Sequence, residues 1–169
     1  VENPDMRSLF LQYDETTPFT QIATDVFTEL LGDTFDQQAI ERIVAHAFPF
    51  SPGLRRITDH IVLLELFSGP SCAFKDYGAS FQASVMEAIL RERGDHAVIL
   101  TATSGDTGSA VARAFHNRPK ISVVILYPSG RVSPLQEQQL TTVGGNVTAL
   151  EVAGSFDDCQ RMVKEAFVD

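Results

Sequence analysis

One lysine, Lys75, follows a strand-like run and begins a helical pattern, a position that favours chemistry at its amine. The apolar run Ile61 to Leu66 predicts a buried strand, and apolar spacing from about residue 76 to 93 predicts a helix. The dipole at a helix N-terminus does not stabilise a cation. Phe74 and Tyr77 flank Lys75 and give it partly apolar surroundings. A lysine held in this way has a lowered proton affinity and can act as a nucleophile, as a Schiff-base lysine must. The alternative is a surface lysine beside Asp76.

A second motif, Thr101-Ala102-Thr103-Ser104-Gly105-Asp106-Thr107-Gly108, lies between a predicted strand and a predicted helix. Small-ligand sites of open α/β sheets lie at such positions, and hydroxyls with unpaired N–H groups at a helix N-terminus suit a carboxylate or phosphate. The motif is neither a Walker loop nor a dinucleotide-binding glycine pattern. The alternative is a well-capped helix start without a ligand.

A third motif, Tyr127 to Gln136, follows another predicted strand. The positive charge of Arg131 could contact an anionic substrate. The alternative interpretation is that Arg131 is an ordinary exposed arginine in a loop. Ser133, Pro134 and Gln136 form a strong helix-start signal, with a Ser N-cap, Pro at the first helical position and Gln at the capping-box position.

Strands and helices alternate from residue 59 onward, which predicts an α/β fold with a parallel sheet and helices on both faces. The predicted strands are 61–66, 97–102, 121–127 and 147–152, and the helices that follow them are 76–93, 106–116, 133–143 and 156–167. A helical accessory segment (19–31 and 38–48) follows a loosely held lead-in (1–18). We place the domain boundary so that 1–58 is the N-terminal segment and 59–169 is the first part of the α/β domain. A sheet this small leaves an edge strand without a partner, so we expect this chain to be a piece of a longer protein.

The composition and net charge of the chain argue against several classes of function. The net charge of −9 argues against nucleic acid or an anionic membrane as a partner, and leaves a small-molecule substrate as the expected ligand. There is no apolar run of membrane-spanning length and no secretory pattern. Cys72 and Cys159 form no metal-ligand spacing and the four histidines are scattered, so we expect no metal site and a reducing, cytoplasmic compartment. Cys72 is interpreted as a small packing residue.

Six segments, taken together and in order, resemble the threonine synthase family of fold-type-II pyridoxal-phosphate enzymes, which is related to the tryptophan synthase β-subunit. They are Leu64-Glu65-Leu66-Phe67 with Gly69-Pro70, Ala73-Phe74-Lys75-Asp76, Ala102-Thr103-Ser104-Gly105-Asp106-Thr107-Gly108, Tyr127-Pro128-Ser129-Gly130, Val132-Ser133-Pro134-Leu135-Gln136, and Gly144-Gly145-Asn146-Val147. The resemblance is dense from about residue 60 to 168, looser over 19–48 and poor over 1–18.

The resemblance implies that Lys75 holds pyridoxal 5'-phosphate as a Schiff base and moves protons once the substrate's amine has displaced it. The implied lyase reaction, a step of threonine biosynthesis, converts O-phospho-L-homoserine and water to L-threonine and phosphate. Thr103, Ser104, Asp106 and Thr107 match the loop that binds the substrate carboxylate and borders the cofactor. Many relatives have Asn at the position of Asp106, whereas threonine synthases commonly have Asp. We expect Asp106 to act through its backbone or to approach the cofactor's phenolic oxygen.

Two parts of the family's site, the loop for the cofactor phosphate and the hydroxyl partner of the pyridine nitrogen, are expected beyond residue 169. We therefore expect the 169-residue chain alone to be inactive. Two other functions stay open: a related phospholyase that releases a keto acid, and a non-catalytic module that binds a phosphorylated small molecule. The oligomeric state is left open.

Overall fold

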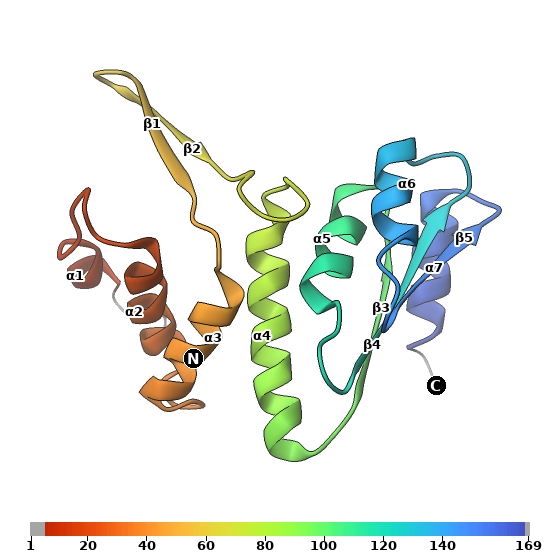
Figure 1. Ribbon diagram of the computed structural model, residues 1–169, viewed down its shortest axis with the longest axis horizontal. Coiled ribbons are helices and arrows are strands. Elements are labelled where there is room, and N and C mark those ends of the chain that lie inside the picture. Colours follow the sequence, from red (N-terminus) through yellow and green to blue (C-terminus); the bar gives the residue numbers. More distant parts are fainter. Residues whose placement is uncertain (1–5, 168–169) are drawn as a thin grey trace.

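A computed structural model describes residues 6–167 and shows an α/β sheet region joined to a helical N-terminal region (Figure 1). The helices are α1 (Arg7–Phe10), α2 (Phe19–Leu31), α3 (Gln37–Ala47), α4 (Lys75–Arg93), α5 (Asp106–Phe115), α6 (Pro134–Thr141) and α7 (Phe156–Glu165). The strands are β1 (Gly53–Thr58), β2 (Ile61–Glu65), β3 (Ala97–Ala102), β4 (Ile121–Pro128) and β5 (Val147–Val152).

The three strands β3, β4 and β5 form a parallel sheet in that order. Ala97 pairs with Ile121 across β3 and β4, and Val123 pairs with Val147 across β4 and β5. The central strand β4 is the most buried of the three, as expected for a strand with a neighbour on each side. The predicted strands 97–102 and 147–152 are confirmed residue for residue.

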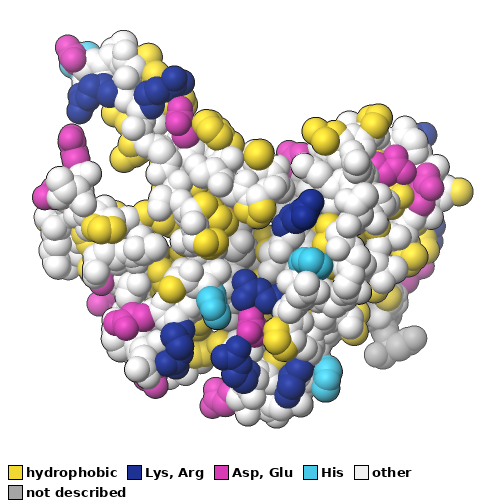
Figure 2. All heavy atoms as spheres, in the orientation of Figure 1, with side chains coloured by type: hydrophobic (Ala, Val, Ile, Leu, Met, Phe, Trp, Pro, Cys, Tyr) yellow, Lys and Arg dark blue, Asp and Glu magenta, His cyan; other side chains and the backbone are white. Residues whose placement is uncertain are grey.

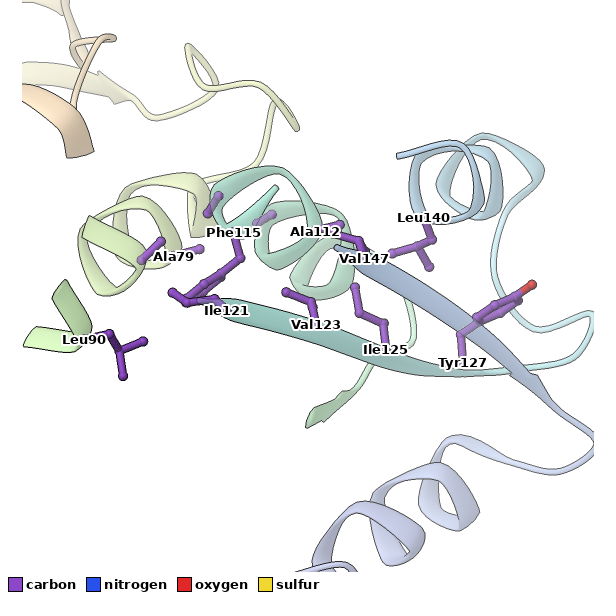
Figure 3. Close-up of a cluster of buried hydrophobic side chains, with 13 residues drawn as sticks. Ala79, Leu90, Ala112, Phe115, Ile121, Val123, Ile125, Tyr127, Leu140 and Val147 are labelled. Carbon is purple, nitrogen blue, oxygen red and sulfur yellow. The ribbon is translucent and has the colours of Figure 1, made fainter. Parts of the chain in front are cut away.

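Helices cover both faces of this sheet, as the sequence predicts. Helix α5 packs against β4 and α6 against β5 on one face, while α7 packs against β3 and β4 on the other (Figure 3). The main core lies under α5 and α6, where Phe115, Ile125 and Leu140 are almost completely buried. Helix α4 packs on α5, so the sheet positions α5 and α5 in turn positions α4.

The apolar run Ile61 to Leu66 does not join the parallel sheet, and the prediction of a buried strand there is wrong. Strand β2 pairs antiparallel with β1 in a hairpin that projects from the rest of the chain (Figure 1). Its apolar side chains are exposed, among them Val62 at 53% and Leu64 at 53%. Strand β1 lies where the sequence predicts only a boundary loop. The division at residues 58 and 59 falls inside this hairpin, and it stays a prediction.

The predicted pair of N-terminal helices is confirmed as α2 and α3, and it packs on α4 through aromatic rings. The rings of Phe27 and Phe81 stack with their centroids 3.7 Å apart, and Phe48 lies beside both. The lead-in contains the short helix α1, which the sequence analysis does not predict, and residues 1–5 lie outside the described part of the chain. Packing on α4 ties the N-terminal helices to the helix that begins at Lys75.

An ion-pair network centred on the buried Glu87 joins α4 to the segment that follows α5. Glu87 of α4 accepts hydrogen bonds at 2.6 Å from both Arg91 and Arg118, and Arg118 also donates to the carbonyl of Ala114. Figure 2 shows basic and acidic side chains side by side on this part of the surface, over α3 and α4. Burial alone would raise the pKa of Glu87, but the hydrogen bond from Arg118 and the charges of Arg118, Arg91 and His46 lower the pKa below its ordinary value.

This lowered pKa predicts a loss of stability in acid. The folded protein takes up the Glu87 proton less readily than the unfolded chain, so the contribution is complete above about pH 4.3 and is lost as the pH falls through the folded-state pKa. We expect wild-type protein to lose more stability than a Glu87→Gln variant when melting temperatures are measured between about pH 5 and pH 3. Glu92→Gln, at an exposed neighbour, is the control and should behave as wild type. Equal pH slopes for wild type and Glu87→Gln would contradict the assignment.

Among residues 6–167, no helix combines the length and the apolar character that crossing a membrane requires.

Candidate active site

The N-terminal ends of α4, α5 and α6 lie at the same end of the molecule (Figure 1). Helix α5 begins where β3 ends and α6 follows the end of β4, which is the edge of a parallel sheet where small-ligand sites lie. The sequence motifs around Lys75, Thr103–Gly108 and Ser133–Gln136 occupy these three helix starts. The fold therefore places at one end of the molecule three motifs that are far apart in the sequence.

Lys75 is the first residue of α4 and is half-buried. Its Nζ lies 4.6 Å from the centroid of the Phe74 ring, within the range of a cation–π contact. Tyr77 does not flank this amine: its ring packs against Phe50 and Phe19, among the N-terminal helices. Residues two apart on a helix point in different directions, so only the Phe74 half of the expected apolar surroundings is confirmed.

Thr103 shapes the loop that leads into α5. Its side chain is buried, and its Oγ1 accepts hydrogen bonds from the N–H groups of Gly105 at 3.0 Å and Gly108 at 2.9 Å. The same hydroxyl donates to the carbonyl of Gly105 at 3.1 Å. A Cβ at Gly108 would overlap the Thr103 side chain, so the close packing requires glycine at that position. The hydroxyl of Thr103 is engaged inside the loop, and its role toward a substrate stays a prediction.

Ser104, Asp106 and Thr107 are exposed on the outer side of the same loop. The main-chain N–H groups of Ser104, Asp106 and Thr107 have no acceptor within the described part of the chain. Donors of this kind at a helix N-terminus bind anions such as carboxylates. The predicted substrate loop therefore has N–H groups that can receive a carboxylate.

A hollow of about 340 Å³ lies between α4 and α5 and joins the two motifs. Lys75 and Phe74 line one side and Thr107 lines the other, with small residues such as Gly78 and Ala110 between them. A Cβ at Gly78 would meet open space, so the hollow is not filled at that point. The structure thus places Lys75 and Thr107 at one hollow, whereas Thr103 lies beneath the loop.

Gln136 also contributes to the site, in a way that the sequence does not predict. Its Nε2 donates to Oδ1 of Asp106 at 2.7 Å, and its side chain lies directly against Gly105. Its Oε1 accepts from the N–H and hydroxyl of Ser133, which completes the capping box of α6. The sequence pattern identifies the capping box, but no local signal reports the bond to a residue 30 positions earlier.

Two further residues near the motifs lie on the surface. Cys72 is exposed and has a positive φ of 58°, so its interpretation as a packing residue is wrong. Arg131 is exposed in the loop after β4, which agrees with its alternative reading as a loop arginine. In the described chain, no group of three or more His, Cys, Asp or Glu side chains is arranged to hold a metal ion.

The chemistry of the hollow fits the cofactor that the sequence resemblance implies. A primary amine at one wall suits an aldehyde, and the unpaired N–H groups at the start of α5 suit a carboxylate. The Phe74 ring and the small residues between the helices leave apolar space beside the amine. Lys75 would hold the cofactor, and the loop at residues 104–107 would border it.

Comparison with known proteins gives the same assignment. The sequence model of the family described as "Pyridoxal-phosphate dependent enzyme" matches residues 50–169. The chain is 44% identical to the threonine synthase of Haemophilus influenzae over 153 residues, and 45% identical to that of Escherichia coli over 152 residues. These alignments cover 90% and 89% of this chain, and 35% of each relative.

Comparison with solved structures also finds threonine synthases. A solved structure of pyridoxal-phosphate-bound threonine synthase from Brucella melitensis matches with a TM-score of 0.85 and 40% sequence identity, over 91% of this chain and 34% of that one. The chain thus spans about a third of the length of the curated relatives it matches. Since the family match extends over more than half of the chain and includes Lys75 and the loop before α5, the chain belongs to the family of pyridoxal-phosphate-dependent enzymes.

Proposed function

We propose that this chain forms part of a threonine synthase, which converts O-phospho-L-homoserine and water to L-threonine and phosphate. The observation that carries the proposal is the shared hollow, which Lys75 lines together with Thr107 of the loop that begins α5. Identity of 44% and 45% to two threonine synthases supports this substrate over others that the family could accept.

Each residue of the site has a part in this reaction. Lys75 would hold the cofactor through its amine, and the same amine would take and return protons at the α and β carbons of the substrate. The N–H groups of Ser104, Asp106 and Thr107 receive the substrate carboxylate. Asp106, oriented by Gln136, borders the cofactor. When bound, pyridoxal phosphate supplies the electron sink for the negative charge that develops at the substrate's α carbon.

The proposal predicts which product receives the oxygen atom of water. The phosphate leaves the γ carbon with its bridging oxygen, and the hydroxyl of water adds at the β carbon. We expect a protein of the relatives' length that contains these residues to form threonine and phosphate in equal amounts. In ¹⁸O-labelled water the label should enter the threonine hydroxyl and be absent from the phosphate, as mass spectrometry of both products will show.

Other products would contradict the synthase assignment. Release of a keto acid and ammonia together with phosphate would identify a phospholyase. Phosphorylated-ligand binding without turnover, and without cofactor attached to Lys75, would identify a non-catalytic module. Both outcomes use the same samples as the labelling experiment.

We also propose the cytoplasm as the compartment of this enzyme. Its support is that both cysteines, the exposed Cys72 and the buried Cys159, are free. Free thiols are typical of proteins in reducing compartments.

A further inference from the structure

The carboxylate of Asp76 is buried directly behind the proposed cofactor lysine, although the sequence suggests only an exposed neighbour. The side chain of Asp76 is 1% exposed. Its Oδ2 accepts from the N–H of Ser71 at 2.9 Å, and its Oδ1 accepts from the Ser71 hydroxyl at 2.7 Å. Asp76 lies in the first turn of α4, where the helix dipole stabilises a negative charge. Both carboxylate oxygens therefore hold one residue of the preceding loop.

The loop before α4 is wrapped closely around this carboxylate. A Cβ at Gly69 would overlap the Asp76 side chain, so the loop backbone passes within contact distance of it. The N–H of Asp76 donates to the carbonyl of Ala73 at 3.0 Å, and the N–H of Cys72 donates to the carbonyl of Gly69 at 3.0 Å. Hydrogen bonds of Asp76 thus hold the loop at Ser71 and Ala73, and the bond from Cys72 ties in Gly69.

We propose that Asp76 is a positioning residue for Lys75. By holding Ser71 it fixes the loop from Gly69 to Phe74, and that loop places the Phe74 ring against the Lys75 amine. The amine is thereby kept in one orientation at the hollow it shares with Thr107. This inference deepens the proposed function, because it rests on Lys75 as the lysine that holds the cofactor.

A purely structural role for Asp76 makes a different prediction. A carboxylate that only stabilises the start of α4 would, when altered, lower the melting temperature and leave the Lys75 amine unchanged in the folded protein. A positioning role changes the behaviour of that amine while the protein stays folded. The reactivity of Lys75 toward a small aldehyde distinguishes the two roles.

The test is reductive labelling of the cofactor-free protein with formaldehyde and cyanoborohydride, followed by mass spectrometry. The protein is one of the relatives' length that contains these residues. Labelling of Lys75 is expressed relative to the exposed Lys120 and Lys164 in the same sample, which serve as internal references. Circular dichroism confirms that each variant is folded at the temperature of labelling.

Ser71→Ala is the deciding variant, because it removes one hydrogen bond to Asp76 and leaves the other in place. We expect the relative labelling of Lys75 to rise about two- to fivefold, because the free energy of an exposed cation–π contact, such as the one to Phe74, corresponds to a factor of that size. Asp76→Asn should raise it at least as far. Ser71→Thr keeps the hydroxyl and should restore the wild-type ratio, and Ser122→Ala, at an exposed serine of β4, should leave the ratio unchanged.

An unchanged Lys75 ratio in folded Ser71→Ala protein would overturn the proposal, whatever happens to the melting temperature. A rise that Ser71→Thr does not reverse would overturn it as well. The labelling uses neither cofactor nor substrate, so its outcome is independent of the product assay. A protein that makes no threonine but shows the Lys75 response would retain the positioning role and lose the proposed function.

Discussion

Replacing Lys75 with alanine is expected to lower turnover by at least about 10²- to 10⁴-fold, because the group that moves protons at the substrate carbons is lost. Lys75→Arg should fail as well, since a guanidinium stays protonated and cannot act as the nucleophile. Borohydride reduction of wild-type protein with pyridoxal phosphate should leave the cofactor on the peptide that contains residue 75. Trypsin does not cut at a modified lysine, so the label should appear on the uncut peptide 57–91.

The other two lysines supply matched controls for this result. Lys120 and Lys164 are exposed, and Lys164 contacts Gln160 on its own helix. Lys120→Arg and Lys164→Arg should therefore turn over substrate and carry the cofactor as wild type does. Cofactor found on residue 120 or 164 with none on residue 75, or wild-type turnover by Lys75→Ala, would refute the assignment of Lys75.

Replacing Thr103 with valine is expected to have the second-largest effect. Valine keeps the shape of threonine, but it leaves the N–H of Gly105 without an acceptor and the N–H of Gly108 with only its 3.1 Å bond to the Gly105 carbonyl. Unsatisfied buried donors cost roughly 1–3 kcal/mol each, so we expect the free energy of unfolding to fall by about 1–4 kcal/mol. Chemical denaturation measures this change. The same loop carries Asp106 and Thr107, so turnover should fall with it.

Two variants show whether the hydroxyl of Thr103 is responsible. Thr103→Ser keeps the acceptor and should retain most of the stability, whereas Thr148→Val, at an exposed position of β5, should have almost no effect. If Thr103→Val unfolded at the same denaturant concentration as wild type, the hydroxyl would not be what holds the loop before α5.

The parts of the fold that the sequence predicts best are those with local signals. Strands 97–102 and 147–152 are runs rich in β-branched and other apolar residues between turns, and the structure has them at the same residues. The start of α6 is marked by a Ser-Pro pair with Gln three residues after the Ser, and the capping box forms as expected. These features depend on a few adjacent residues, so a sequence pattern suffices to find them.

The predictions from sequence fail where interacting residues are distant in the sequence, or where one sequence pattern is compatible with two structural environments. The run 61–66 reads the same whether it is buried in a parallel sheet or paired in a hairpin, and only its pairing with β1 decides between them. Asp76 follows a lysine and looks like a surface residue, yet the loop from Gly69 covers it. The bond from Gln136 to Asp106 joins residues 30 apart, and no periodicity encodes it.

That bond has a consequence for how the site can change during evolution. Because the Oε1 of Gln136 is engaged by Ser133, its amide must present Nε2 to residue 106. The start of one helix thereby selects a hydrogen-bond acceptor at the start of another, and Asp and Asn both satisfy it. Residues with only donors, such as Lys, do not. Substitutions at position 106 are thus constrained by the cap of α6, and the two positions are expected to mutate as a linked pair.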